Sequence, residues 1–158
     1  MGIAGNFPAA FTKTQLAIDY EPPRGGEVFI SVNDGDKRNI TAIARSIARL
    51  GFSLVATTGT ARALRASGIE CEEVGKIHAG SHTILDRIAS GEIVLMINTP
   101  FGSSTNTDGY EMRAACVRHG VSYCTTLAGA QALIAGMEAV RETGLDVIAL
   151  QDLPQWEG

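Results

Sequence analysis

The stretch Val55-Ala-Thr-Thr-Gly-Thr60 decides the fold of this chain, because it joins the end of an apolar strand to the start of a helix. Residues 52–56 have the composition of a buried strand, and residues 61–67 form a short helical segment that Gly68 closes. A strand, a turn on Gly59 and a helix make the repeating unit of a parallel sheet covered by helices.

The same alternation continues on both sides of this unit. Strands are predicted at residues 28–32, 52–56, 69–74, 93–97 and 121–124, and helices at 37–50, 61–67, 81–89, 106–119 and 127–141. Asp36 is the predicted cap of the first of these helices. The glutamates of 69–74 indicate an edge strand, and the apolar run 93–97 indicates a central one. The pattern predicts an α/β three-layer sandwich, with a five-stranded parallel sheet flanked by helices.

Composition narrows the class of protein. The net charge of −4 provides no basic field for nucleic acid, so no nucleic-acid partner is expected. No apolar run approaches the length of a membrane span, so no membrane partner is expected either. The 3 cysteines form no C-x-x-C pair, which favours free thiols in a reducing, cytoplasmic setting. His78 and His82 lack a third ligand at metal spacing, so no metal site is expected.

Residues 1–26 differ from the rest of the chain. The apolar residues between Phe7 and Ile18 follow helical spacing, and the Pro- and Gly-containing stretch 20–26 reads as an extended linker. We therefore expect a short amphipathic helix tethered before a main domain at 27–158. Its apolar face needs a partner that the main domain is not expected to supply.

The Val55–Thr60 turn has the features of an anion site. The first N–H groups of a helix lack internal partners and carry partial positive charge, and threonine hydroxyls add further donors. The turn contains neither the lysine of a Walker loop nor the three glycines of a dinucleotide fingerprint.

Polar, donor-rich residues follow every predicted strand. Because the carboxyl ends of parallel strands meet at one edge of the sheet, these residues are expected to converge. They include Ser31 and Lys37 after the first strand, Thr57, Thr58, Gly59 and Thr60 after the second, Lys76 after the third, Asn98 and Thr99 after the fourth, and Thr125 and Thr126 after the fifth. Lysines and helix N–H groups suit a phosphate, and Asn and Thr suit a sugar or a base.

Each of these residues also has a purely structural interpretation. Thr57, Thr60, Thr125 and Thr126 can serve as helix caps, and Lys37 and Lys76 can be solvated surface charges. Asn98 followed by Thr99-Pro100 is an ordinary turn signal. The stretches Asp86-Arg87 and Glu111-Met-Arg113 are interpreted as charges on helix surfaces.

Six motifs, in order and with their spacing, resemble the methylglyoxal-synthase-like domain at the C-terminus of the carbamoyl phosphate synthetase large subunit. They are Asp34-Gly-Asp-Lys37, Val55-Ala-Thr-Thr-Gly-Thr-Ala61, Lys76-Ile-His-Ala-Gly80, Asp86-Arg87-Ile88, Gly91-Glu-Ile-Val-Leu-Met-Ile-Asn-Thr99 and Tyr123-Cys-Thr-Thr-Leu127. Residues 1–16 resemble the end of the preceding synthetase domain, which implies that the chain is part of a longer protein.

The resemblance implies a regulatory domain that performs no catalysis and needs no cofactor of its own, in a parent ligase that uses ATP with Mg or Mn. It implies a nucleotide monophosphate effector, UMP or IMP, and ornithine at the border with the synthetase domain. It further implies contacts with the synthetase domains and the small glutaminase subunit. The positions that match the family's nucleotide site are Ser31, Lys37, Thr57, Thr60, Lys76 and Asn98, with Thr126 beside the nucleotide, and Tyr123 and Thr125 match the ornithine side.

The chain departs from the bacterial pattern after Asn98-Thr99. Pro100 replaces a small hydroxyl residue, Ser103 and Ser104 stand where two arginines would be, and Cys124 replaces an aspartate. These changes imply fewer phosphate or ribose contacts on that side.

Three other functions remain open. Methylglyoxal synthase needs a carboxylate base near the phosphate turn, but Gly80-Ser81-His82 lacks it, and residues 100–107 lack its histidine. The cyclohydrolase half of a purine-pathway enzyme shares the fold but has a Lys-Thr-Leu-His-Pro stretch that is absent here. A dimerisation module, forming a homo-oligomer through the N-terminal helix, would leave the donor-rich edge unexplained.

Overall fold

The computed structural model describes residues 2–17, 21–75, 83–100, 107–144, 149 and 151. The helices are α1 (Phe7–Leu16), α2 (Ile40–Arg49), α3 (Thr58–Ala66), α4 (Ile84–Ala89), α5 (Thr107–His119) and α6 (Leu127–Thr143), with a 3-10 turn at Asp34–Asp36. The strands are β1 (Glu27–Ser31), β2 (Ser53–Thr57), β3 (Glu72–Val74), β4 (Ile93–Asn98) and β5 (Ser122–Cys124).

The five strands form one parallel sheet in the order β3-β2-β1-β4-β5. The chain leaves β1 toward β2 on one side and leaves β4 toward β5 on the other. The sheet therefore has a topological switch point between β1 and β4, where Ser31 and Asn98 are paired at the strand ends. The predicted edge position of the third strand is confirmed. The fourth strand lies inside the sheet, but the central strand is β1.

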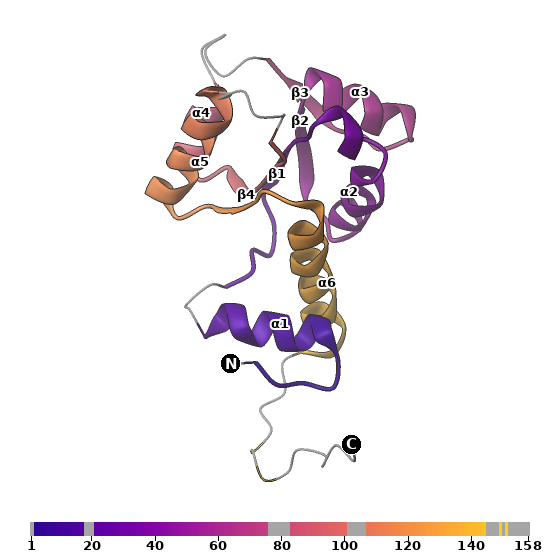
Figure 1. Ribbon diagram of the computed structural model, residues 1–158, viewed down its shortest axis with the longest axis vertical. Helices are drawn as coiled ribbons and strands as arrows, with labels where there is room; N and C mark the ends of the chain where they lie inside the picture. The colour runs from indigo at the N-terminus through magenta and orange to yellow at the C-terminus, as the bar shows by residue number, and fades with distance from the viewer. Residues whose placement is uncertain are drawn as a thin grey trace.

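Helices cover both faces of the sheet, which confirms the predicted three-layer α/β sandwich (Figure 1). On one face, Ile30, Ile47 and Ile134 belong to the core that β1 forms with α2, α3 and α6. On the other face, Phe29, Ile88 and Met112 belong to a separate core with α4 and α5. Successive side chains of β1 thus enter opposite cores, as expected for a strand buried on both sides.

The helix starts differ from the predicted ones at α2 and α4, and also at α3. Asp36 was the predicted helix cap, but it lies inside the 3-10 turn. The cap of that turn is Asn33, whose side-chain oxygen accepts a hydrogen bond from the Asp36 N–H at 3.1 Å. The N-cap residue of the helix at residues 40–49 is Asn39, and its side chain makes no capping hydrogen bond. The predicted helix at 81–89 begins, within the described residues, at Ile84 after Thr83, which forms a capping box with Asp86.

Arg87 is not the surface charge that its sequence context suggests. Its side chain is 11% exposed, and its two terminal nitrogens lie 3.2 Å from Glu27 and 2.6 Å from Glu72. These ion pairs hold α4 to the amino ends of β1 and β3, on the opposite edge from the polar strand ends.

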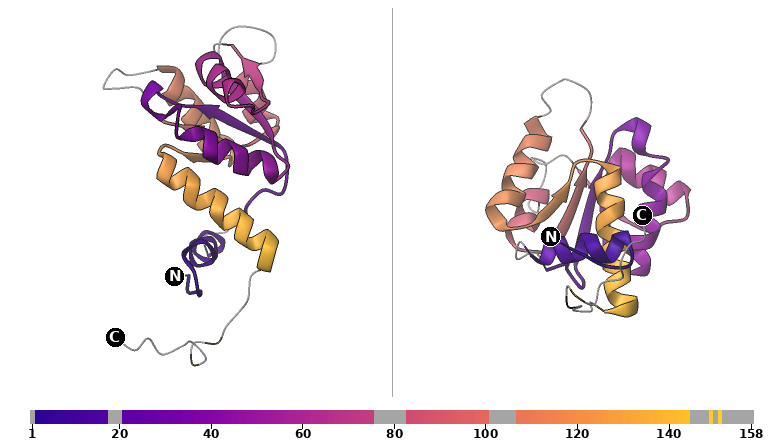
Figure 2. Two further views of the ribbon diagram at one scale, coloured as in Figure 1. Left: turned by 90° about the vertical axis from the view of Figure 1, so that its right-hand side faces the viewer. Right: turned by 60° about the horizontal axis from the view of Figure 1, so that its bottom comes forward.

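The N-terminal helix α1 packs across α6, away from the sheet (Figures 1 and 2). Thr12 is buried, and a Cβ at Gly136 would collide with its hydroxyl oxygen, so the glycine permits this close crossing. The sequence did not lead us to expect a partner for α1 within the main domain, but α6 provides one. Phe7 remains 66% exposed.

Arg141 ties the linker to the main domain. Its guanidinium donates to the carbonyl of Leu50 at 2.6 Å and to that of Arg24 at 3.4 Å. Among the described helices, none combines the length and the apolar character that crossing a membrane requires.

Candidate functional site at the carboxyl edge of the sheet

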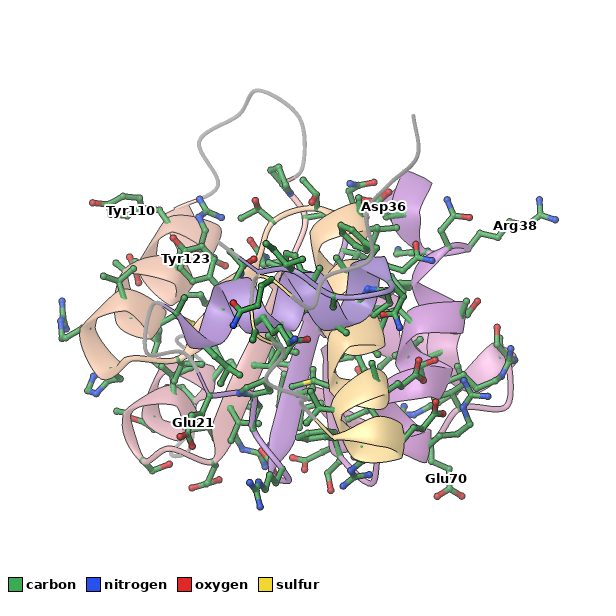
Figure 3. The ribbon with its side chains drawn as sticks, turned by 90° about the horizontal axis from the view of Figure 1, so that it is seen from below. Glu21, Asp36, Arg38, Glu70, Tyr110 and Tyr123 are labelled. Atoms are coloured by element: carbon green, nitrogen blue, oxygen red, sulfur yellow. The ribbon has the colours of Figure 1, made fainter. Side chains whose placement is uncertain are left out.

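The carboxyl ends of the strands gather the described polar residues that the sequence singled out. Asp36 of the 3-10 turn and Tyr123 of β5 lie in the upper half of the view in Figure 3, and Glu70 lies at the lower right. The switch point between β1 and β4 lies in the middle of this carboxyl edge. Ligands of open α/β sheets bind at such a place.

The N-terminus of α3 is the first part of the site. The helix begins at Thr58, three residues earlier than predicted, so Thr58, Gly59 and Thr60 form its first turn. Thr57 is the N-cap residue by backbone conformation, but its side chain makes no capping hydrogen bond. Its hydroxyl lies instead 3.4 Å from that of Ser31 and 3.3 Å from that of Thr60. The first N–H groups of α3 are therefore not capped by Thr57 and can face an anion.

Thr60 has a structural task. It is 1% exposed, and its hydroxyl oxygen accepts the backbone N–H of Val32 at 3.2 Å. This bond ties the first turn of α3 to the residue that follows β1. The Thr60 hydroxyl thus shapes the turn, and the exposed Thr58 is better placed to meet solvent or a ligand.

Lys37 reaches over the same helix turn. Its ammonium nitrogen would lie 2.9 Å from a Cβ at Gly59, so a side chain there would collide with it. Gly59 is part of the helix and does not form the turn that the sequence suggested. Because it has no side chain, it leaves room for the Lys37 ammonium above it. Lys37 also forms an ion pair with Asp34 at 2.5 Å and remains 30% exposed.

Asn33 and Thr99 connect the loops that follow β1 and β4 at the switch point. The Thr99 hydroxyl oxygen accepts the Asn33 backbone N–H at 3.0 Å and its side-chain amide at 3.1 Å. The same Asn33 amide donates to Asp36 at 2.7 Å. Thr99 is buried, so its hydroxyl holds two loops together and has little contact with solvent.

Asn98 and Arg113 form a pair that the sequence did not reveal. Asn98 is 6% exposed, and its side-chain oxygen accepts a hydrogen bond from Arg113 at 2.9 Å. Arg113 lies on α5 and was interpreted as a surface charge, but α5 points it toward the end of β4. The sequence carries no signal that joins the two residues; in the fold, Gly109, four residues earlier, leaves room for the Arg113 guanidinium, from which a Cβ there would lie 3.1 Å.

The β5 side of the edge differs from the α3 side. Thr126 caps α6 by accepting the Gly129 N–H at 3.1 Å, which favours its structural interpretation. Tyr123 and Thr125 are exposed. Burial raises the pKa of the Cys124 thiol, so this thiol stays protonated and is a weak nucleophile near neutral pH.

Several predicted residues cannot be placed. Lys76, His78 and His82, and also Ser103 and Ser104, lie outside the described residues. Among the residues that the structure describes, no group of three His, Cys, Asp or Glu side chains could hold a metal ion.

The chain is similar to known proteins over nearly its whole length. Residues 39–125 match the family of MGS-like domains. A carbamoyl phosphate synthase large chain, C-terminal section, from Methanopyrus kandleri is 49% identical over 154 residues, covering 97% of this chain and 28% of that protein. A carbamoyl phosphate synthase large chain from Myxococcus xanthus is 41% identical over 152 residues, covering 96% of this chain and 14% of that protein. The chain therefore spans only a small part of these relatives.

The fold also matches that of a solved enzyme. Methylglyoxal synthase from Elizabethkingia anophelis superposes with a TM-score of 0.57 at 16% identity, over 71% of this chain and 78% of the enzyme. At that identity the likeness concerns the fold alone. Taken together, the parallel sheet, the family match and the related large chains show that this chain belongs to the family of MGS-like domains, in the form found in carbamoyl phosphate synthase large chains.

Proposed function

We propose that this chain is an allosteric regulatory domain that binds a nucleotide monophosphate, UMP or IMP, at the carboxyl edge of its sheet. The observation that carries the proposal is the N-terminus of α3, where the Thr57 side chain provides no cap and Lys37 lies over Gly59. A phosphate there would accept backbone N–H groups and meet a positive charge. Lys76 is proposed to add a second charge.

The sugar and the base would extend toward the switch point. Neighbouring strands lie about 4.8 Å apart, so the end of β2 and the end of β4 are separated by about 10 Å. That span suits a nucleoside monophosphate with its phosphate at Thr58 and its sugar or base near Asn98. Ser31, which lies between them on β1, would contact the middle of the ligand.

Regulation would pass to the rest of a longer protein. We propose that the parent is a carbamoyl phosphate synthase that uses ATP with Mg or Mn and supplies pyrimidine and arginine synthesis in the cytoplasm. Tyr123 and Thr125 would contribute to an ornithine site facing the synthetase domains. A ligand can regulate a distant site only if two states of the protein bind it differently.

The direct test is calorimetric titration of the chain with UMP and with IMP. We expect saturable binding of at least one nucleotide. Lys37→Ala removes a charge-assisted contact of about 1.5–3 kcal/mol, so it should weaken binding about tenfold or more. Arg118→Ala, which removes a charge from an exposed residue in the last turn of α5, serves as the control. No saturable heat with either nucleotide at millimolar concentration would contradict the proposal.

The competing function is a lyase of the methylglyoxal synthase type, which the shared fold and one local feature favour. Asp34 brings a carboxylate near the α3 turn through its ion pair with Lys37, although Gly80-Ser81-His82 lacks the family's base. We expect no methylglyoxal from dihydroxyacetone phosphate. Turnover that disappears in Asp34→Asn would establish catalysis and reverse the order of the two functions.

A further inference from the structure

Arg113 carries a positive charge to the candidate site without a carboxylate partner among residues 2–17, 21–75, 83–100 and 107–144. Its single hydrogen bond to these residues goes to Asn98 Oδ1, at 2.9 Å. The half-buried guanidinium is admitted by Gly109, where a Cβ would lie 3.1 Å from Nη1 and 3.4 Å from Asn98 Oδ1. The glycine thus leaves space for this pair.

The chemistry of arginine determines how the Asn98 amide is oriented. A guanidinium has five N–H donors and no acceptor, so only the oxygen of a carboxamide can face it. The Asn98 NH2 group must then point away from α5. It lies 3.5 Å from the carbonyl oxygen of Ser31, in the crevice between β1 and β4.

The Asn98 NH2 group has two hydrogens to donate but only one long hydrogen bond to the described residues. A distance of 3.5 Å is at the limit of a hydrogen bond, and the same Ser31 carbonyl already accepts the Thr99 N–H at 3.1 Å. Asn98 is 6% exposed, so water has little access to its two amide hydrogens. A buried donor with one long contact is unfavourable unless another acceptor reaches it.

We propose that Arg113 is a positioning residue that fixes Asn98 as a hydrogen-bond donor and so sets the chemistry of the ligand at the switch point. The ligand must present an oxygen acceptor there, a sugar hydroxyl or a carbonyl of the base. This inference rests on the proposed nucleotide site. It adds a source of selectivity: Arg113, which does not itself contact the ligand, orients Asn98 so that the end of β4 accepts only a ligand with a hydrogen-bond acceptor.

A double-mutant cycle tests whether Arg113 acts through Asn98. UMP and IMP affinities are measured by calorimetry for the wild type, Arg113→Gln, Asn98→Ala and the double variant. We expect Arg113→Gln to weaken binding about tenfold, as for the loss of one contact of about 1.4 kcal/mol. In the Asn98→Ala background the same change should cost nothing, because the group that it positions is gone. Equal costs in both backgrounds would show a direct contact with the ligand and overturn the proposal, as would unchanged binding by Arg113→Gln.

Conservative variants separate positioning from a merely structural role. Arg113→Lys keeps a donor for Asn98 Oδ1 and should restore most of the affinity that Arg113→Gln loses. Asn98→Asp keeps a partner for Arg113 but replaces the donor with an acceptor, so it should retain the melting temperature and lose nucleotide binding. Arg118→Gln, an exposed change on the same helix, controls for the removed charge. An Asn98→Asp variant that binds like the wild type would contradict the required donor.

An NMR measurement keeps this inference separate from the proposed function. If the wild type binds neither nucleotide, the proposed function fails, but the orientation of Asn98 can still be measured. We expect nuclear Overhauser contacts from the Asn98 NH2 protons to the Thr99 amide proton, on the crevice side, and their loss or broadening in Arg113→Gln. Stronger contacts from those NH2 protons to the Arg113 side chain than to the Thr99 amide proton would overturn the assigned orientation.

Discussion

The N-termini of α3 and α6 have similar threonine-rich sequences but different structures. Both helices follow a strand, have a threonine as N-cap residue, Thr57 for α3 and Thr126 for α6, and contain a glycine in the first turn. In α6, Thr126 accepts the Gly129 N–H at 3.1 Å and caps the helix. In α3, the Thr57 hydroxyl lies near Ser31 and Thr60, and Lys37 covers the turn.

The difference shows how a helix start is made available to a ligand. A capping side chain satisfies an N–H group and lowers the need for an external acceptor. At α3 the threonine is diverted by neighbouring hydroxyls, so the N–H groups keep their need for an acceptor. The same residue type therefore caps the helix at α6 and leaves the first turn of α3 without a side-chain cap.

Replacing Gly59 of α3 or Gly129 of α6 by alanine should give the largest contrast between the two helix starts. Gly59→Ala places a Cβ 2.9 Å from the Lys37 ammonium and should lower nucleotide affinity about tenfold or more, with no loss of stability, because alanine favours helix by up to about 1 kcal/mol. Gly129→Ala crowds the Thr126 hydroxyl at 3.1 Å and should lower the melting temperature. Calorimetry and thermal melting measure both quantities. Normal binding by Gly59→Ala would remove Lys37 from the site.

Removing each threonine hydroxyl should give a smaller contrast. Thr126→Ala loses a helix cap and should lower the free energy of unfolding by about 1 kcal/mol. Thr57→Ala loses no capping bond, so its free energy of unfolding should change less, while nucleotide binding weakens. Urea denaturation compares the two variants. An equal loss of stability would mean that Thr57 supports α3 as Thr126 supports α6.

Releasing Lys37 from its carboxylate should give the smallest effect, in the opposite direction. Asp34→Asn leaves the ammonium free to meet a phosphate and should tighten nucleotide binding a few-fold, since an exposed ion pair is worth only about 0.2–1 kcal/mol. Glu70→Gln, at the opposite edge of the sheet, controls for the change in net charge (Figure 3). Weaker binding by Asp34→Asn alone would indicate that Asp34 contacts the ligand.

The sequence predicted the architecture because its signals are local and repeated. Apolar runs at β1, β2 and β4 and glycines after the helices mark a β/α alternation, which physical rules convert into a parallel sheet. The edge position of β3 followed from its glutamates. The central position of β1 could not be read in this way, because β1 and β4 are similarly apolar and strand order depends on long-range pairing.

The individual roles of the site residues were harder to predict. Thr57 and Thr126 are both N-cap residues by backbone conformation, and the proximity of Ser31 and Thr60 to Thr57 separates their roles. Arg113 contacts Asn98 across 15 positions of sequence, so no local pattern connects them. Gly59 was assigned to a turn, because its close approach to the Lys37 ammonium exists only in the folded chain.

The long helix α6 has a mechanical consequence. Its first turn stands beside the carboxyl edge at Thr126, and Gly136 touches Thr12 of α1. At 1.5 Å per residue these points are about 15 Å apart, so a tilt of about 4° about the α1 contact displaces Thr126 by about 1 Å. A tilt of α6 about its contact with α1 would therefore move the carboxyl edge, and the lack of a side chain at Gly136 keeps that contact close.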